Sequence, residues 1–200
     1  DGLCLSSTDP QIHKAAVERL FKITDLAATL KADVIIGGVR GRLSGSEQEQ
    51  VSQKENIIDG VRQCCTYAAQ LGITILLEAI NRYETNFINT AAEGMNFINE
   101  VGRPNLKILL DTFHMNIEEV DLPTAIHMTG KSLGYIHFVD SNRLSPGQGH
   151  INLVSVLKAL EEIDYQGVIS AEILPLPDDH SAVQRTANYL ESLGVKMGTV

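Results

Sequence analysis

The chain has 200 residues with 44% hydrophobic content, enough for one sizeable core. Its net charge is −9 and no stretch concentrates lysine and arginine, which argues against a nucleic-acid partner. No apolar run reaches the roughly 18 residues that span a bilayer, and no secretion signal follows Asp1, so we expect no membrane partner. The 3 cysteines include no Cys-x-x-Cys pair, which favours a reducing cytoplasm over a disulfide framework.

Short apolar segments alternate with longer segments of helical spacing along the whole chain. The first helix follows Thr8, Asp9 and Pro10, a typical helix start, and its apolar residues recur at intervals of three and four through Leu30. The expected elements after it are, in chain order, strand Val34–Ile36, helix Glu47–Leu71, strand Ile73–Leu77, helix Asn89–Val101, strand Leu106–Leu110, helix Glu118–Thr129, strand Leu133–Phe138, helix Leu153–Ile163, strand Val168–Ile173 and helix Asp179–Leu193.

This alternation predicts an α/β fold with parallel strands joined by right-handed crossovers. Two architectures compete, an open doubly wound sheet and a (β/α)8 TIM barrel. The open sheet usually carries a glycine-rich phosphate loop after an early strand, and the segment 37–41 does not match that motif, so we favour the barrel. A closed barrel needs about 250 residues. We therefore expect residues 1–200 to form a single domain, the C-terminal portion of a TIM barrel without its N-terminal βα units.

Metal-capable side chains close four of the five expected strands: Glu78, Asp111, His137 and Glu172. A carboxylate at the end of a buried strand is costly unless a cation or a partner neutralises it. In a barrel the C-terminal strand ends face one mouth, so we expect these four side chains to converge on a single divalent ion. Three carboxylates and one imidazole suit Mn²⁺, Mg²⁺ or Co²⁺ better than Zn²⁺, because no thiolate is present.

Three more polar residues lie at short offsets from these strand ends. Glu84 follows the first strand end by six residues, His114 the second by three and Arg143 the third by six. We expect them on loops above the barrel mouth, where they would hold hydroxyl and carbonyl oxygens of a substrate. Arg40, in the loop after the first strand, would recognise an anionic group, which leaves a phosphorylated or carboxylated substrate open.

The segments around these residues resemble the signature blocks of the xylose-isomerase-like TIM barrels, and most of all the ketose 3-epimerases of the D-tagatose and D-psicose 3-epimerase group. The blocks are residues 78–84 (EAINRYE), 110–119 (LDTFHMNIEE), 136–143 (IHFVDSNR) and 170–172 (SAE). The resemblance implies that the four strand-end residues bind the metal and that Glu78 and Glu172 double as the catalytic acid/base pair. It also implies that the three loop residues contact substrate oxygens.

The function predicted in this way is a metal-dependent isomerase or epimerase of a small keto sugar, with Mn²⁺ as the first choice and Mg²⁺ or Co²⁺ as alternatives. A proton next to the carbonyl would leave and return through a cis-enediolate. Two alternatives stay open, an isomerase of a hydroxypyruvate-type keto acid and a non-catalytic binding module on the same scaffold. Barrels of this kind commonly pair, so a homo-oligomer is also open.

Overall fold

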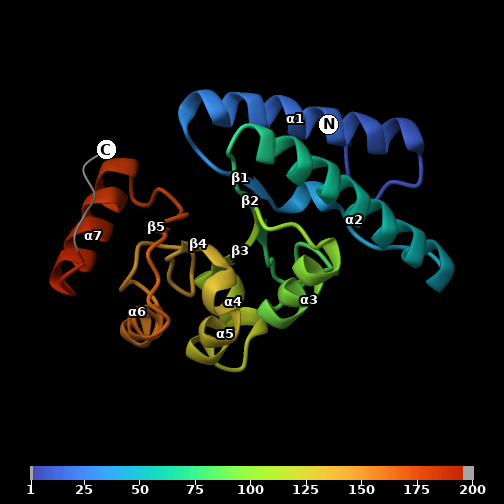
Figure 1. Ribbon diagram of the computed structural model, residues 1–200. Coiled ribbons are helices and arrows are strands. Elements are labelled where there is room, and N and C mark those ends of the chain that lie inside the picture. Colours follow the sequence, from blue (N-terminus) through green and yellow to red (C-terminus); the bar gives the residue numbers. More distant parts are fainter. Residues whose placement is uncertain (1, 196–200) are drawn as a thin grey trace.

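The computed structural model describes residues 2–195, which form a parallel β-sheet surrounded by helices (Figure 1). The strands are β1 (Val34–Ile36), β2 (Ile75–Glu78), β3 (Leu106–Asp111), β4 (Leu133–His137) and β5 (Val168–Ser170). The α-helices are α1 (Pro10–Leu30), α2 (Glu47–Gln70), α3 (Ala91–Val101), α4 (Thr112–Glu118), α5 (Leu122–Thr129), α6 (Leu153–Glu162) and α7 (Asp179–Ser192).

The order of the strands separates the two architectures that the sequence left in competition. A doubly wound sheet reverses its strand order at a switch point, whereas a barrel adds each new strand beside the last one. Here the strands stand in the order β1-β2-β3-β4-β5, and all neighbouring pairs are parallel. The sheet is therefore an arc of a (β/α)8 barrel, which confirms the predicted fold class. Within residues 2–195, β1 and β5 are its outer strands.

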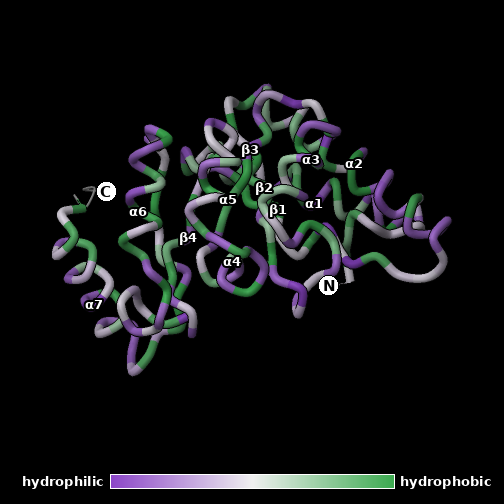
Figure 2. Tube along the Cα trace, turned by 90° about the horizontal axis from the view of Figure 1, so that it is seen from below, coloured by the Kyte–Doolittle hydropathy of each residue, from purple (hydrophilic) through white to green (hydrophobic). Residues whose placement is uncertain are grey.

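Burial on both faces explains the continuous apolar sequence of the central strands. Residues 75–77 of β2 and 108–110 of β3 are at most 1% exposed. Alternate side chains pack under the helices and the others fill the barrel interior. The hydropathy colouring in Figure 2 shows this apolar centre around β2 and β3, with hydrophilic residues on the outer helices. These strands form a rigid base that fixes where their C-terminal residues point.

Side-chain caps decide where several helices begin. Asp9 caps α1, and Ser46 with Glu49 forms a capping box at the start of α2. The predicted helix Glu118–Thr129 is wrong, because the segment belongs to two helices. Asp121 accepts a hydrogen bond from the Thr124 backbone and starts α5, while α4 ends before it. No helix within residues 2–195 combines the length and the apolar character needed to cross a membrane.

Candidate metal centre

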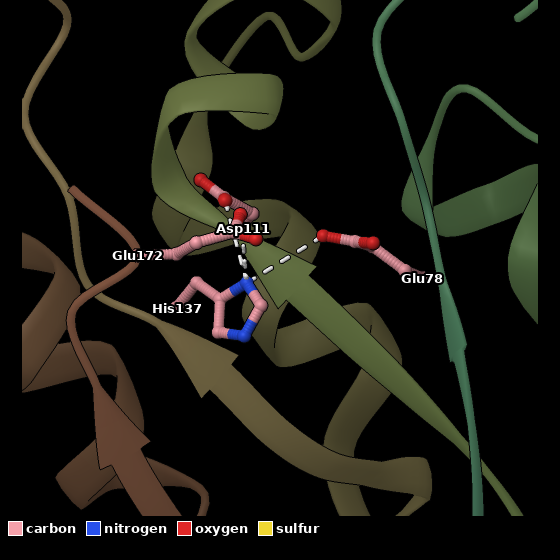
Figure 3. A group of neighbouring side chains, drawn as sticks. All are labelled: Glu78, Asp111, His137 and Glu172. Atoms are coloured by element: carbon pink, nitrogen blue, oxygen red, sulfur yellow. Dashed lines mark ion pairs between the residues drawn. The ribbon is translucent and has the colours of Figure 1, made fainter. Parts of the chain in front are cut away.

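The C-terminal ends of β2 to β5 bring four metal-capable side chains to one point. Glu78, Asp111 and His137 are the last residues of β2, β3 and β4, and Glu172 follows β5 by two residues. Asp111 and His137 are direct neighbours in the β3–β4 register. One ligand atom from each of the four lies within 4.8 Å of the others. Figure 3 shows the side chains pointing inward, with Glu78 and Glu172 approaching from opposite sides.

The imidazole of His137 lies among the three carboxylates. Its Nδ1 is 3.5 Å from Glu78 Oε1, 3.4 Å from Asp111 Oδ2 and 3.6 Å from Glu172 Oε2. Within the described part of the chain, the first two oxygens and Nδ1 are buried without a hydrogen-bond partner. Ligands that each stand about 2.1 Å from a divalent ion are about 3.0–3.5 Å apart, so this spacing and these unpartnered atoms fit a shared cation.

The electrostatics of the cluster favour a positive charge at its centre. Burial by itself would lower the pKa of His137, but the carboxylates of Asp111 and Glu78, which lie 3.4 and 3.5 Å from Nδ1, outweigh it, and the pKa is raised to about 9. In the metal-free protein a proton on His137 therefore supplies the charge that a cation would supply. The donor set of three carboxylates and one imidazole suits a hard divalent ion.

Local contacts orient these ligands. The Asp111 Oδ1 atom accepts a 2.7 Å hydrogen bond from the Phe113 backbone N–H and caps α4, which turns Oδ2 toward the other ligands. The Thr112 hydroxyl exchanges two hydrogen bonds with the Val139 backbone and so ties the end of β3 to the segment after β4. A Cβ on Gly37 would lie 2.8 Å from a Glu78 oxygen, so this carboxylate needs a glycine beside it. Such outer contacts commonly tune a metal site.

Glu84, His114 and Arg143 line a cavity of about 430 Å³ together with Glu78 and Glu172. The expectation that all three stand on loops is wrong for His114, which lies in the first turn of α4 because Asp111 caps a helix there. Arg143 donates a 2.5 Å hydrogen bond to Glu172 Oε2, and its other terminal nitrogen is 3.5 Å from Glu84 Oε1. Its backbone is left-handed, with φ of 61°, a conformation that costs non-glycine residues free energy and is frequent at functional sites. The side chain of His114 is only 3% exposed.

The expectation that Arg40 recognises an anionic group is wrong. Its side chain is fully buried and cannot meet a ligand. It donates four hydrogen bonds to the backbone carbonyl groups of Gly37, Glu78, Phe87 and Ile88. Burial lowers its pKa to about 10, against the opposing influence of the Glu78 charge. Arg40 therefore braces the loops behind the site, and the cavity is lined instead by the neighbouring Arg42.

Asn81 is a site residue that the sequence did not single out. It lies in the loop after β2, is 2% exposed, and its amide nitrogen contacts both Glu84 and His114. It belongs to the block at residues 78–84, and the family resemblance of this block was the only indication in the sequence that Asn81 could be a site residue. An asparagine in a loop is by default a solvated turn residue, so only the folded contacts reveal its place.

A barrel arc that gathers three carboxylates and an imidazole at its strand ends could hold a divalent metal ion. Residues 2–193 match the family described as "Xylose isomerase-like TIM barrel", and the chain belongs to this family. The predicted resemblance is thereby confirmed.

Individual relatives narrow the likeness to ketose 3-epimerases. The chain is 39% identical to an L-ribulose 3-epimerase of Methylomonas sp. (strain DH-1), over 84% of this chain and 59% of the relative. It is 38% identical to a D-psicose 3-epimerase of Ruminiclostridium cellulolyticum, over 84% and 58%. The crystal structure of a D-allulose 3-epimerase from Methylomonas sp. superposes with a TM-score of 0.86 at 32% identity, covering 95% of this chain and 73% of that one. The chain thus spans less than two thirds of the length of these two curated relatives.

Proposed function

We propose that the chain carries the metal-binding half of a ketose 3-epimerase, an enzyme that inverts the carbon next to the carbonyl group of a small keto sugar. The convergence of Glu78, Asp111, His137 and Glu172 within 4.8 Å carries this proposal. Relatives that are named for L-ribulose and D-psicose support the substrate class. We favour Mn²⁺ as the bound ion, with Mg²⁺ and Co²⁺ as alternatives, and the cytoplasm as the compartment. A homo-oligomer is compatible with this proposal.

A divalent ion held by these four residues would stabilise the negative charge that develops on the substrate oxygens when a proton leaves. The work of the chain itself is proton transfer by Glu78 and Glu172. One carboxylate removes the proton next to the carbonyl to give a cis-enediolate, and the other returns a proton from the opposite face. Their approach from opposite sides of the cluster suits the inversion (Figure 3).

Glu84, His114 and Arg143 would hold the substrate between these two carboxylates. Arg143 fixes Glu172 through its 2.5 Å hydrogen bond, so this carboxylate has a defined direction although its side chain is 52% exposed. Glu84 offers acceptor oxygens and His114 a ring nitrogen on the same cavity wall. Donors and acceptors that alternate around a cavity match the hydroxyl and carbonyl oxygens of an open-chain sugar.

Proton exchange with solvent tests the proposal. The protein, loaded with Mn²⁺ in D₂O, should incorporate deuterium at carbon 3 of L-ribulose or D-psicose, as followed by NMR. Deuterium at carbon 1 or 2 would indicate aldose–ketose isomerisation instead. Glu172→Gln should stop the exchange while leaving the fold intact, because this side chain is 52% exposed. Metal binding without any exchange in the unmodified protein would refute the epimerase and favour a binding module.

A further inference from the structure

The oxygen and the nitrogen of the Asn81 side-chain amide both have hydrogen-bond partners. Its Oδ1 accepts a 3.0 Å hydrogen bond from the Tyr83 backbone N–H. Its Nδ2 lies 3.1 Å from Glu84 Oε1 and 2.7 Å from His114 Nδ1. Both amide hydrogens and the amide oxygen are therefore used. With 2% exposure, the side chain has little water to exchange for these partners.

Two of these contacts fix which way the amide points. An ionised carboxylate only accepts hydrogen bonds, so the atom facing Glu84 must be the NH₂ group. A backbone N–H only donates, so the atom facing Tyr83 must be the oxygen. The orientation is thus determined by chemistry on both sides, independently of the usual ambiguity between oxygen and nitrogen in asparagine.

The same orientation determines where His114 carries its proton. Since Asn81 presents a donor to Nδ1, that ring nitrogen must accept. In a neutral imidazole the proton then sits on Nε2. The Nε2 atom is 4.0 Å from Glu78 Oε1, beyond hydrogen-bond distance, and the ring lines the cavity.

We propose that Asn81 is a positioning residue that holds His114 as the neutral Nε2–H tautomer, so that the ring offers a hydrogen-bond donor to a ketose oxygen. The role toward the substrate rests on the proposed function, whereas the tautomer is a property of the protein alone. Asn81 also holds Glu84, an acceptor, 4.0 Å from the same ring. That distance is to the accepting Nδ1 atom of His114, and both side chains line the cavity, so Asn81 fixes one donor and one acceptor for the oxygens of a polyol.

The tautomer can be read directly by NMR. With ¹⁵N-labelled histidine at about pH 8, above the ordinary histidine pKa of about 6.5, long-range ¹H–¹⁵N spectra distinguish protonated from unprotonated ring nitrogens. The His114→Gln variant identifies the His114 signals among those of the 6 histidines. We expect Nε2 to be protonated and Nδ1 to be a hydrogen-bonded acceptor in the metal-free protein. A proton on Nδ1 would overturn the proposal without any variant.

Matched variants test whether Asn81 is the cause. Asn81→Leu keeps the shape but removes the donor, so the two His114 tautomers should interconvert and their averaged ring-nitrogen signals should move toward each other. Asn89→Leu is the control, because Asn89 lies in the same loop and donates to the Ile80 and Thr85 carbonyl groups. It should keep the unmodified His114 signals. Identical His114 signals in Asn81→Leu and the unmodified protein would overturn the proposal.

Measurements of kcat/KM and of Mn²⁺ affinity distinguish a failure of this inference from a failure of the proposed function. With Mn²⁺ and D-psicose or L-ribulose, Asn81→Leu should lower kcat/KM by about 10- to 100-fold, while calorimetry should show Mn²⁺ affinity changed by less than about 3-fold. Unchanged kcat/KM would overturn the role toward the substrate. An unmodified protein that is inactive on both sugars would refute the proposed function, and the tautomer would still be decided by the spectra.

Discussion

Replacing Asp111 by asparagine is the sharpest test of the metal centre. Asp111 is fully buried, and its Oδ1 caps α4 while Oδ2 faces the other ligands. Asparagine caps a helix as well as aspartate does, so Asp111→Asn should keep α4 and remove one ligand charge. Loss of a residue that only hydrogen-bonds to a metal ligand lowers metal affinity by about 10–100-fold. Loss of a ligand itself should therefore raise the Kd for Mn²⁺ by at least about 100-fold.

The size of the expected rise in Tm follows from the linkage between ion binding and folding. At a free Mn²⁺ concentration 100 times its Kd, the ion stabilises the unmodified protein by about 2.7 kcal/mol. For a chain of this size each kcal/mol moves Tm by about 2–4 °C, so Tm should rise by about 5–11 °C. At the same concentration Asp111→Asn should gain only about 0.4 kcal/mol, or about 1–2 °C.

Differential scanning calorimetry with and without Mn²⁺ measures these shifts. Asp121→Asn is a matched control, because Asp121 also caps a helix and lies outside the cluster. It should keep the full rise in Tm. A full rise in Asp111→Asn, or no rise in the unmodified protein, would refute the reasoning that the strand ends share one ion.

Three further predictions concern the protein without metal. The pKa of His137 is about 9 in the folded state, above its unfolded value, so its stabilising contribution is complete below about pH 6.5 and is lost as the pH rises through 9. Urea unfolding at about pH 6 and pH 10 should show a loss of about 2 kcal/mol that is absent in His137→Gln; an equal loss in that variant would contradict the assignment. Burial raises the pKa of Cys64 and Cys65 to about 12, so iodoacetamide at about pH 8 should label all 3 cysteines only after unfolding; rapid labelling of all of them in the folded protein would show that these thiols are accessible. Arg40→Met removes four hydrogen bonds to backbone carbonyl groups, of which those of Gly37 and Ile88 keep a backbone donor, and should lower the free energy of unfolding by about 3 kcal/mol or more; a loss below about 1 kcal/mol would contradict a stabilising role of Arg40.

The sequence predicted the sheet and the convergence at its end because both depend on local patterns. Continuous apolar runs identify strands that are buried on both faces, and the expected strand Val34–Ile36 coincides with β1. Parallel strands place all their C-terminal ends at one edge, so a residue such as Asp111 or His137 has its neighbourhood fixed by its position in the run. The parallel topology of the sheet thus places residues that are far apart in the sequence in one cluster.

The parts that the sequence did not predict depend on contacts between loops. Arg40 is buried because four carbonyl groups from three segments of the chain surround it, whereas an arginine outside the strands is exposed by default. The contact between Asn81 and His114 joins residues 33 positions apart, neither of which ends a strand. The break at Asp121 was missed because the apolar pattern on both sides is helical, although the Asp121 cap and Pro123 in the first turn of α5 both mark a new helix start.

The four side chains of the candidate metal site differ in how much freedom the fold leaves them. Glu78, Asp111 and His137 are at most 8% exposed and are held by strands, so their conformational entropy is already spent when an ion arrives. Glu172 follows β5 by two residues, its side chain is 52% exposed, and its carboxylate accepts a hydrogen bond from Arg143. In the proposed site the three buried side chains would be preorganised for an ion, whereas the position of Glu172 depends on its hydrogen bond from Arg143.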